Sequence, residues 1–182
     1  MRSLDFDPIE EARRQWDAHG WNSAAPGVAA VTSIMRAQQV YQARVDEVLR
    51  PFDLTFARYE LLMVLKFSRS GLMPLSKLGD RLQVHPTSVT NAVDRLEAQG
   101  LIRRRAHDSD RRMTMAELLP EGRVLAERAT DVLNREVFER PGLSEEEIEQ
   151  LFVLLRKLRI EAGDFDSESA KRPIEPETVE SA

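Results

Sequence analysis

Apolar side chains recur every three or four positions in two long stretches of the chain. Over 28–52 they fall at positions 28, 31, 34, 41, 45, 48, 49 and 52, which predicts an amphipathic helix of about seven turns, stopped by Pro51. A second helix is predicted over 144–162, because Ser144 and Glu147 form a capping box ahead of an apolar stripe: Ile148, Leu151, Leu154, Leu155 and Leu158. Each stripe is longer than one small domain can cover. Pairing both helices across a two-fold axis would bury the stripes, so we expect a homodimer.

Shorter helical patterns fill the middle of the chain. Thr55 predicts the start of a helix that ends near Gly71. Ser76 then caps a short helix, and Pro86 opens a longer one that ends before Gly100. Because a turn of only three residues separates these last two helices, the pattern predicts a helix-turn-helix.

Two strands and two further helices complete the pattern. The strands 101–106 and 112–119 flank a polar loop and predict an antiparallel hairpin. A helix is predicted over 120–140, and a short one over 7–19 with Asp7 as its N-cap. We therefore expect a mainly α fold with a small β-hairpin.

The length and composition predict one domain with tails. A chain of 182 residues with 42% hydrophobic content can bury one good core. We expect an N-terminal helical extension over 1–25, a domain over 26–162 with its core at 55–119, and a disordered acidic tail over 163–182.

The composition also excludes several kinds of chemistry. The chain has no cysteine, and its three histidines show no ligand spacing, so we expect no metal and no cofactor. It has no Gly-rich phosphate loop and no Ser, His and Asp spacing that suggests a nucleophile, so we do not expect an enzyme. The longest apolar run, 61–65, is far shorter than the ~20 residues of a membrane span, and no leader-like segment opens the chain. We expect a soluble, cytoplasmic protein.

Charge is distributed unevenly. The net charge is −5, yet the segment 71–112 has eight Lys or Arg against five acidic residues. A locally basic segment in an acidic chain is typical of a nucleic-acid-binding module. The alternative is an ordinary solvated face, and charge alone does not separate the two.

The helix that begins at Pro86 has two different faces. Its apolar residues at 89, 92, 93 and 96 lie three, four and seven apart and would pack inward. Thr87, Ser88, Asn91 and Arg95 would then point outward, and these are side chains that read base edges or bind phosphates. Thr87 and Ser88 also favour a helix start for local reasons, an alternative that explains Asn91 poorly.

Five arginines lie within residues 100–112, the segment GLIRRRAHDSDRR. Arg111 and Arg112 would lie at the hairpin tip, where they could enter the minor groove or contact phosphates. Asp110 could hold Arg112 in place before binding, and Asp108 could stabilise the turn. The alternative is an exposed ion pair of little energetic weight.

Together these residues resemble a known family. The segment LSKLGDRLQVHPTSVTNAVDRLEAQGLIRRRAHDSDRRMTMAELLPEG, 75–122, is similar to the winged helix-turn-helix of the MarR family of bacterial transcriptional regulators, and the similarity extends more loosely over 26–160. The resemblance implies N- and C-terminal dimerisation helices, a pseudo-palindromic double-stranded DNA operator, and a repressor released by a small ligand. From the residue patterns and this resemblance together, the predicted DNA-binding residues are Ser76, Pro86, Thr87, Ser88, Thr90, Asn91, Arg95, Asp110, Arg111 and Arg112.

The resemblance also implies a crevice for a small effector, often an aromatic carboxylate. Aromatic and arginine side chains suit such a ligand, and the candidates are Trp16, Trp21, Arg36, Tyr41, Arg44, Arg58 and Tyr59. Each has an alternative explanation, as core, interface or surface.

A winged-helix module that binds protein instead of DNA is the competing hypothesis. Such a surface would expose Trp, Tyr or Leu. Asn91 and the arginines of the hairpin favour DNA.

Overall fold

A computed structural model describes residues 4–107 and 113–166. The chain divides into two compact units, residues 1–47 and 48–182, and each is described by itself. Most of the predicted tail lies outside the described residues. So do four residues of the hairpin tip: Asp108, Asp110, Arg111 and Arg112.

The first unit contains helix α1 (Pro8–Ala18) and most of helix α2 (Ala25–Leu49). The predicted cap of α1 is confirmed, since the Asp7 carboxylate accepts the backbone N–H of Ile9 at 2.9 Å. Helix α2 begins at Ala25 instead of position 28. Pro26 lies in its first turn, where no backbone N–H is needed, so this proline is compatible with the earlier start of the helix.

The end of α2 also differs from the prediction. The helix stops at Leu49, a 3₁₀ turn η1 (Arg50–Phe52) follows, and Asp53 then adopts a left-handed φ of 52°. Pro51 is the reason, because it has no N–H to donate and its ring clashes with the preceding turn of an α-helix. The predicted role of Pro51 as the stop is confirmed, but the last three residues of the predicted range, 50–52, form a 3₁₀ turn instead of α-helix.

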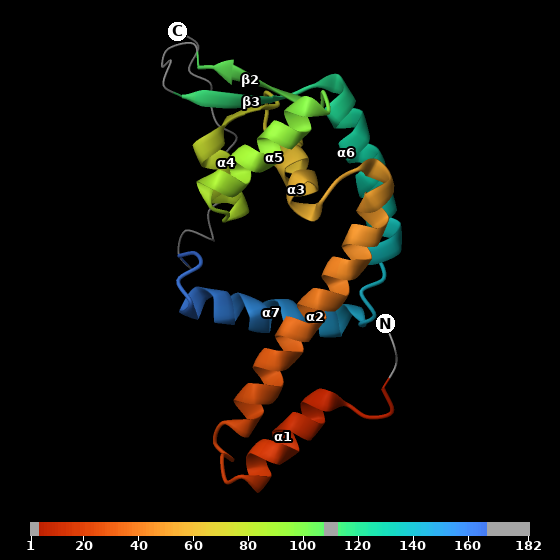
Figure 1. Cartoon of the computed structure of the whole chain (residues 1–182), viewed down its shortest axis with the longest axis vertical. Helices are drawn as coiled ribbons and strands as arrows, with labels where there is room; N and C mark the ends of the chain where they lie inside the picture. The colour runs from red at the N-terminus through yellow and green to blue at the C-terminus, as the bar shows by residue number, and fades with distance from the viewer. Residues whose placement is uncertain (1–3, 108–112, 167–182) are drawn as a thin grey trace. The chain divides into compact units, whose positions relative to one another are not determined.

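The second unit is mainly helical with a small sheet, as predicted (Figure 1). After the turn η1, its elements in chain order are α3 (Phe56–Phe67), β1 (Leu72–Pro74), α4 (Leu75–Leu82), α5 (Pro86–Ala98), β2 (Ile102–Ala106) and β3 (Thr114–Leu118). The Thr55 hydroxyl accepts the backbone N–H of Arg58 at 3.4 Å, which confirms the predicted start of α3.

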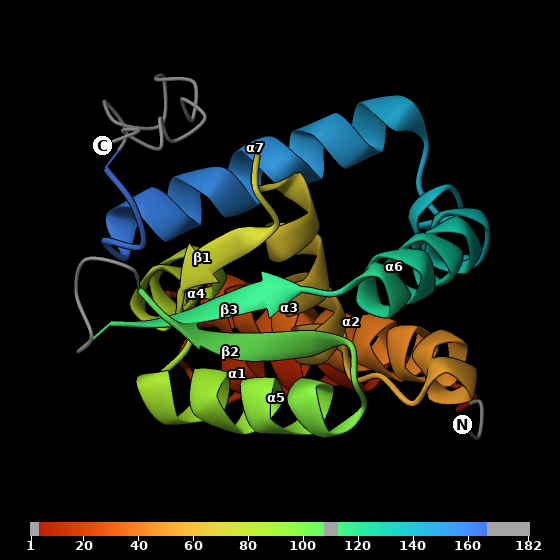
Figure 2. The ribbon, with the colours of Figure 1, turned by 90° about the horizontal axis from the view of Figure 1, so that it is seen from above.

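The sheet has three antiparallel strands in the order β1-β3-β2, which lie side by side in Figure 2. Ala116 of β3 lies opposite Arg104 of β2 and opposite Met73 of β1. The predicted hairpin is therefore present, but strand β1 was not predicted. With three residues, one of them Pro74, it is too short to show a period-2 alternation.

Strand β1 also changes how helix α4 begins. The chain passes from Pro74 directly into α4, whose N-cap is Pro74 and has no side-chain hydrogen bond. The prediction that Ser76 caps this helix was wrong, because Ser76 already lies in its first turn, where it is exposed.

Buried aliphatic side chains from α3, α4, α5 and the sheet form the core of this unit. They include Leu61, Leu62, Leu65, Met73, Leu78, Val93, Leu96 and Ile102. The helix-turn-helix is thus anchored to α3 and to the sheet through its apolar face, and the opposite face of α5 is left exposed.

After the sheet, helix α6 (Pro120–Leu133) ends in a π-helical turn η2 (Asn134–Phe138), so the predicted helix over 120–140 is not one regular α-helix. Helix α7 (Glu145–Glu161) follows, with the predicted capping box between Ser144 and Glu147. No residue of α7 is buried. Among residues 4–107 and 113–166, no helix combines the length and apolar content that a bilayer crossing requires.

One close approach ties α6 to the start of strand β2. The carbonyl oxygen of Leu101 accepts the backbone N–H of Leu119 at 3.0 Å, and the next turn brings buried Gly122 against the same carbonyl. A Cβ added at Gly122 would lie 2.1 Å from that oxygen and 2.9 Å from Cδ1 of Leu118.

We therefore expect Gly122→Ala to lower the free energy of unfolding by about 1–3 kcal/mol, because the backbone has to shift to admit a methyl group. Urea denaturation of the purified variant measures this. Gly27→Ala is the matched control, since Gly27 lies in α2 with nothing within 4 Å of an added Cβ. The control is expected to leave stability unchanged or raise it by up to ~1 kcal/mol. Equal stability of Gly122→Ala and the wild type would contradict the close approach.

Candidate nucleic-acid interface

Helix α5 presents a continuous polar face to solvent. Its apolar residues Val89, Val93 and Leu96 are buried, which orients the rest of the helix. The exposed residues on the other side include the predicted Thr87, Ser88, Thr90, Asn91 and Arg95, and also the acidic residue Asp94. The structure thus brings the residues predicted from the helical period together on one surface.

Local contacts fix the first turn of this helix. The Nδ1 atom of His85 accepts the backbone N–H of Thr87 at 3.3 Å and lies 3.1 Å from its hydroxyl. The hydroxyl of Thr90 donates to the carbonyl oxygen of Pro86 at 3.1 Å. Gln83, at the end of α4, adopts a left-handed φ of 52° that turns the chain sharply into α5. The polar residues of the turn are therefore held in place by neighbours in sequence.

The three arginines of β2 form ion pairs with acidic residues of the same chain. Two of them share one carboxylate of the neighbouring strand, because Arg103 lies 2.6 Å and Arg105 lies 3.6 Å from Oε2 of Glu117. A second hydrogen bond of 2.9 Å makes the contact between Arg103 and Glu117 bidentate. Strand alternation turns Arg104 to the opposite face of the sheet. There it contacts Asp94 at 2.6 Å and Glu97 at 2.5 Å, both on α5.

These contacts favour the charged forms of the partners. The pKa of Glu97 is lowered chiefly because its carboxylate accepts the backbone N–H of Arg104, and the nearby guanidinium adds to this effect against some desolvation. Hydrogen bonding by Arg103 lowers the pKa of Glu117 in the same way. Burial disfavours the charge on Arg104, but hydrogen bonds to Glu97 and Asp94 outweigh it, so its pKa is raised. The sequence predicted a cluster of positive charge here, and it did not predict these acidic partners.

The seven predicted ligand residues are distributed over both units. In the first unit Trp16 and Trp21 meet edge to face with ring centroids 5.4 Å apart. Arg44 lies over the ring of Tyr41 at 5.8 Å, and Arg36 donates to a side chain of its own helix.

The other two ligand candidates, Arg58 and Tyr59, lie in the second unit. Tyr59 is only 6% exposed, and its hydroxyl lies 3.0 Å from that of Thr130. Arg58 contacts the Thr55 hydroxyl at 3.3 Å. The environment of Tyr59 is that of a core residue.

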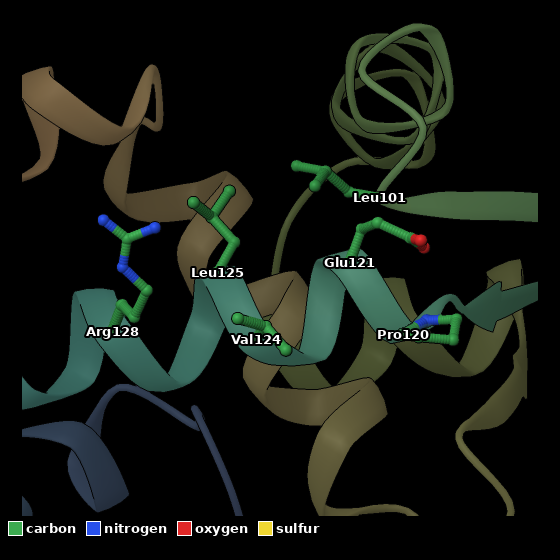
Figure 3. Close-up of a pocket in the computed structure, with 6 residues that line it drawn as sticks. All are labelled: Leu101, Pro120, Glu121, Val124, Leu125 and Arg128. Carbon is green, nitrogen blue, oxygen red and sulfur yellow. The ribbon is translucent and has the colours of Figure 1, made fainter.

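A cavity of about 420 Å³ lies along the first turns of α6 (Figure 3). Its wall is mostly apolar, with one carboxylate and one guanidinium, and the lining residues are Leu101, Pro120, Glu121, Val124, Leu125 and Arg128. None of the seven predicted ligand residues lines it. In the described part of the chain, no three His, Cys, Asp or Glu side chains cluster as a metal site.

Comparison with known proteins identifies the family. The family model "MarR family" matches residues 54–114. The solved structure of Sco5413, a MarR family transcriptional regulator from Streptomyces coelicolor, is 49% identical, covers 78% of this chain and 99% of its own, and has a TM-score of 0.71. The chain belongs to the MarR family. As a member it is a transcriptional regulator with a winged-helix fold, not an enzyme.

Two further relatives extend this finding. Sco3205, another MarR family regulator from Streptomyces coelicolor, was solved in complex with DNA and is 26% identical, with coverage of 76% of this chain and 88% of its own and a TM-score of 0.65. YhbI of Bacillus subtilis (strain 168), an uncharacterized HTH-type transcriptional regulator, is 43% identical over 85 residues, or 47% of this chain. The match spans 54% of YhbI, about half of that relative.

Proposed function

We propose that this MarR family member is a homodimeric repressor that binds a pseudo-palindromic operator in double-stranded DNA and is released by a small ligand. The observation that carries DNA binding is the exposed polar face of α5. It combines an amide, three hydroxyls and a guanidinium, the groups that hydrogen-bond to base edges and phosphates in the major groove. Its one carboxylate, Asp94, is paired with Arg104.

The same face disfavours the protein-binding alternative. A surface that docks another protein usually exposes large apolar or aromatic side chains at its centre. The large exposed apolar residues of the described chain lie elsewhere, and none of them is on α5.

The exposed apolar stripe of α7 supports the dimer. Leu154 is 65% exposed and Phe152 is 56% exposed, and Ile148, Leu151, Val153 and Leu158 are also exposed. An apolar surface of this extent is unfavourable in water, so it requires a cover. A second copy of the chain provides an equal stripe on the same helix, and a two-fold axis would pair them. Two copies of α5 would then bind the two half-sites of one operator.

We infer that the effector is a small aromatic acid that contacts the first unit. The edge-to-face pair of Trp16 and Trp21 offers aromatic surface, and Arg36 and Arg44 of α2 offer positive charge. Arg58 and Tyr59 belong to the second unit and are not part of this proposal.

Asn91→Ala is expected to weaken operator binding by about 1–3 kcal/mol and to relax the preference at one base position, since a side chain that reads a base edge is lost.

Arg112→Ala is expected to weaken binding to all sequences and to make the salt dependence shallower, as expected for a phosphate or minor-groove contact. Fluorescence anisotropy with DNA flanking the gene, or with a sequence selected from a random pool, measures both. Arg14→Ala, which removes one exposed charge from α1, is the control, and wild-type affinity in both test variants would contradict the docking.

Leu154→Glu is expected to convert the dimer to a monomer, because two buried, facing carboxylates cannot pair across the axis. Sedimentation velocity gives the mass, and circular dichroism checks that the helices remain. Phe67→Glu makes the same kind of change at a 76% exposed residue of α3 and should leave the mass unchanged. A wild-type chain that sediments as a monomer would refute the dimer.

A panel of aromatic carboxylates is expected to contain compounds that quench tryptophan fluorescence and release the operator at the same concentrations. Trp16 and Trp21 are the only tryptophans of the chain, so the signal reports on α1 and its turn. Release without quenching would place the ligand elsewhere, and this outcome would contradict the assignment to Trp16 and Trp21.

A further inference from the structure

Arg104 makes a set of contacts that no other described arginine of β2 makes. Its guanidinium lies 2.6 Å from Oδ1 of Asp94 and 2.5 Å from Oε2 of Glu97, and it donates to the carbonyl oxygen of Thr90 at 3.4 Å. Its backbone N–H donates to the other oxygen of Glu97 at 2.7 Å. One residue of the sheet thus contacts three residues of α5.

The three partners form a stripe along the helix. Thr90, Asp94 and Glu97 are four and three positions apart, which places them on one side of α5 over two turns. Strand β2 lies alongside α5 over this length (Figure 2). The stripe shares Thr90 with the exposed polar face of α5 and borders Asn91 and Arg95. Arg104 is therefore fixed at the edge of the proposed DNA-binding surface without being part of it.

The neighbouring arginines have a different role. Arg103 and Arg105 contact Glu117 on β3, and both contacts stay within the sheet. They hold the two strands of the hairpin to each other, whereas the side chain of Arg104 holds the hairpin to the helix. Its planar fork suits this task, because it can serve two carboxylates and a carbonyl at once, which an ammonium group does with less defined geometry.

We propose that Arg104 is a positioning residue for DNA binding, which fixes the angle between helix α5 and the β2–β3 hairpin so that both meet the DNA together. This inference rests on the proposed function. With Arg104 engaged by Asp94 and Glu97, its charge is compensated within the protein and does not serve as a phosphate contact. Without it, the hairpin has to be ordered against the helix each time DNA binds, and this ordering opposes binding.

The test compares Arg104→Ala, Arg104→Lys and the control Arg103→Ala on a duplex that the wild-type protein selects from a random pool. Arg104→Ala is expected to weaken binding by about tenfold, the cost of ordering one or two side chains and a loop, with an unchanged salt slope. Arg104→Lys should resemble it, because the charge remains but the fork is lost. Arg103→Ala removes the same charge from the same strand and should stay within about twofold of the wild type.

A double variant separates positioning from direct contact. If Arg104 acts through the hairpin, Arg104→Ala in the Arg112→Ala background should add little, because the contact that it positions is already gone. Additive losses together with a salt slope reduced by about one would mean a phosphate contact and would overturn the proposal. Full affinity in Arg104→Lys would overturn it as well.

Hydrogen exchange tests the same contact without DNA. Arg104→Ala is expected to speed amide exchange in peptides that span β2 and the end of α5, with global stability checked by urea denaturation. Unchanged exchange would refute the positioning role, even in a protein that binds DNA as proposed. A third outcome is that exchange speeds up in Arg104→Ala but the wild type selects no sequence from the pool. The proposed function then fails. The contact between helix and hairpin is then only structural, which also overturns the positioning role.

Discussion

The burial of one face of α5 is the constraint on which the rest of the second unit depends. Val89, Val93 and Leu96 have to enter the core, and with a period of 3.6 residues this choice turns Asn91 and Arg95 outward. The core is built from α3, α4 and a sheet of three short strands, so the helix sits at the surface of a small, well-packed support. A change in register of α5 would bury its polar groups and expose its apolar ones. The packing that folds this unit therefore also exposes the polar face of α5.

Electrostatics imposes the second constraint, because an acidic chain has to present a surface that a polyanion accepts. The arginines of β2 show that local positive charge is not the same as free positive charge. Glu117 neutralises part of Arg103 and Arg105, and acids of α5 neutralise Arg104. A count of charge along the sequence therefore overstates what this strand offers to DNA. A paired arginine instead fixes how two elements are oriented relative to each other, since a bidentate contact fixes orientation better than a solvated side chain does.

The sequence was most informative where the signal is local. The caps at Asp7, Thr55 and Ser144, the apolar period of α5 and the two strands of the hairpin are all confirmed. Errors arose where a residue type has two local meanings or where a partner is distant in sequence. Pro26 can end a segment or open a helix, and β1 becomes a strand only because β3 pairs with it. The contacts of Arg104 with Asp94 and Glu97 depend on how β2 lies along α5, which no spacing in the sequence contains.

Helix α7 shows what the structure adds to a family resemblance. A resemblance assigns α7 to dimerisation by position alone, but the structure adds that this helix buries none of its residues and exposes a row of leucines. Its capping box and its three acids in the first turn stabilise the N-terminal end of the helix only, because caps and dipole interactions act within the first turn. They leave the apolar stripe uncompensated. Since the free energy of exposing such a stripe is repaid only by covering it, the association of two chains and the stability of this helix are expected to be thermodynamically linked. Assembly would then decide whether two copies of α5 are available at the spacing of two half-sites, so that the apolar stripe of α7 would contribute to how the DNA is recognised.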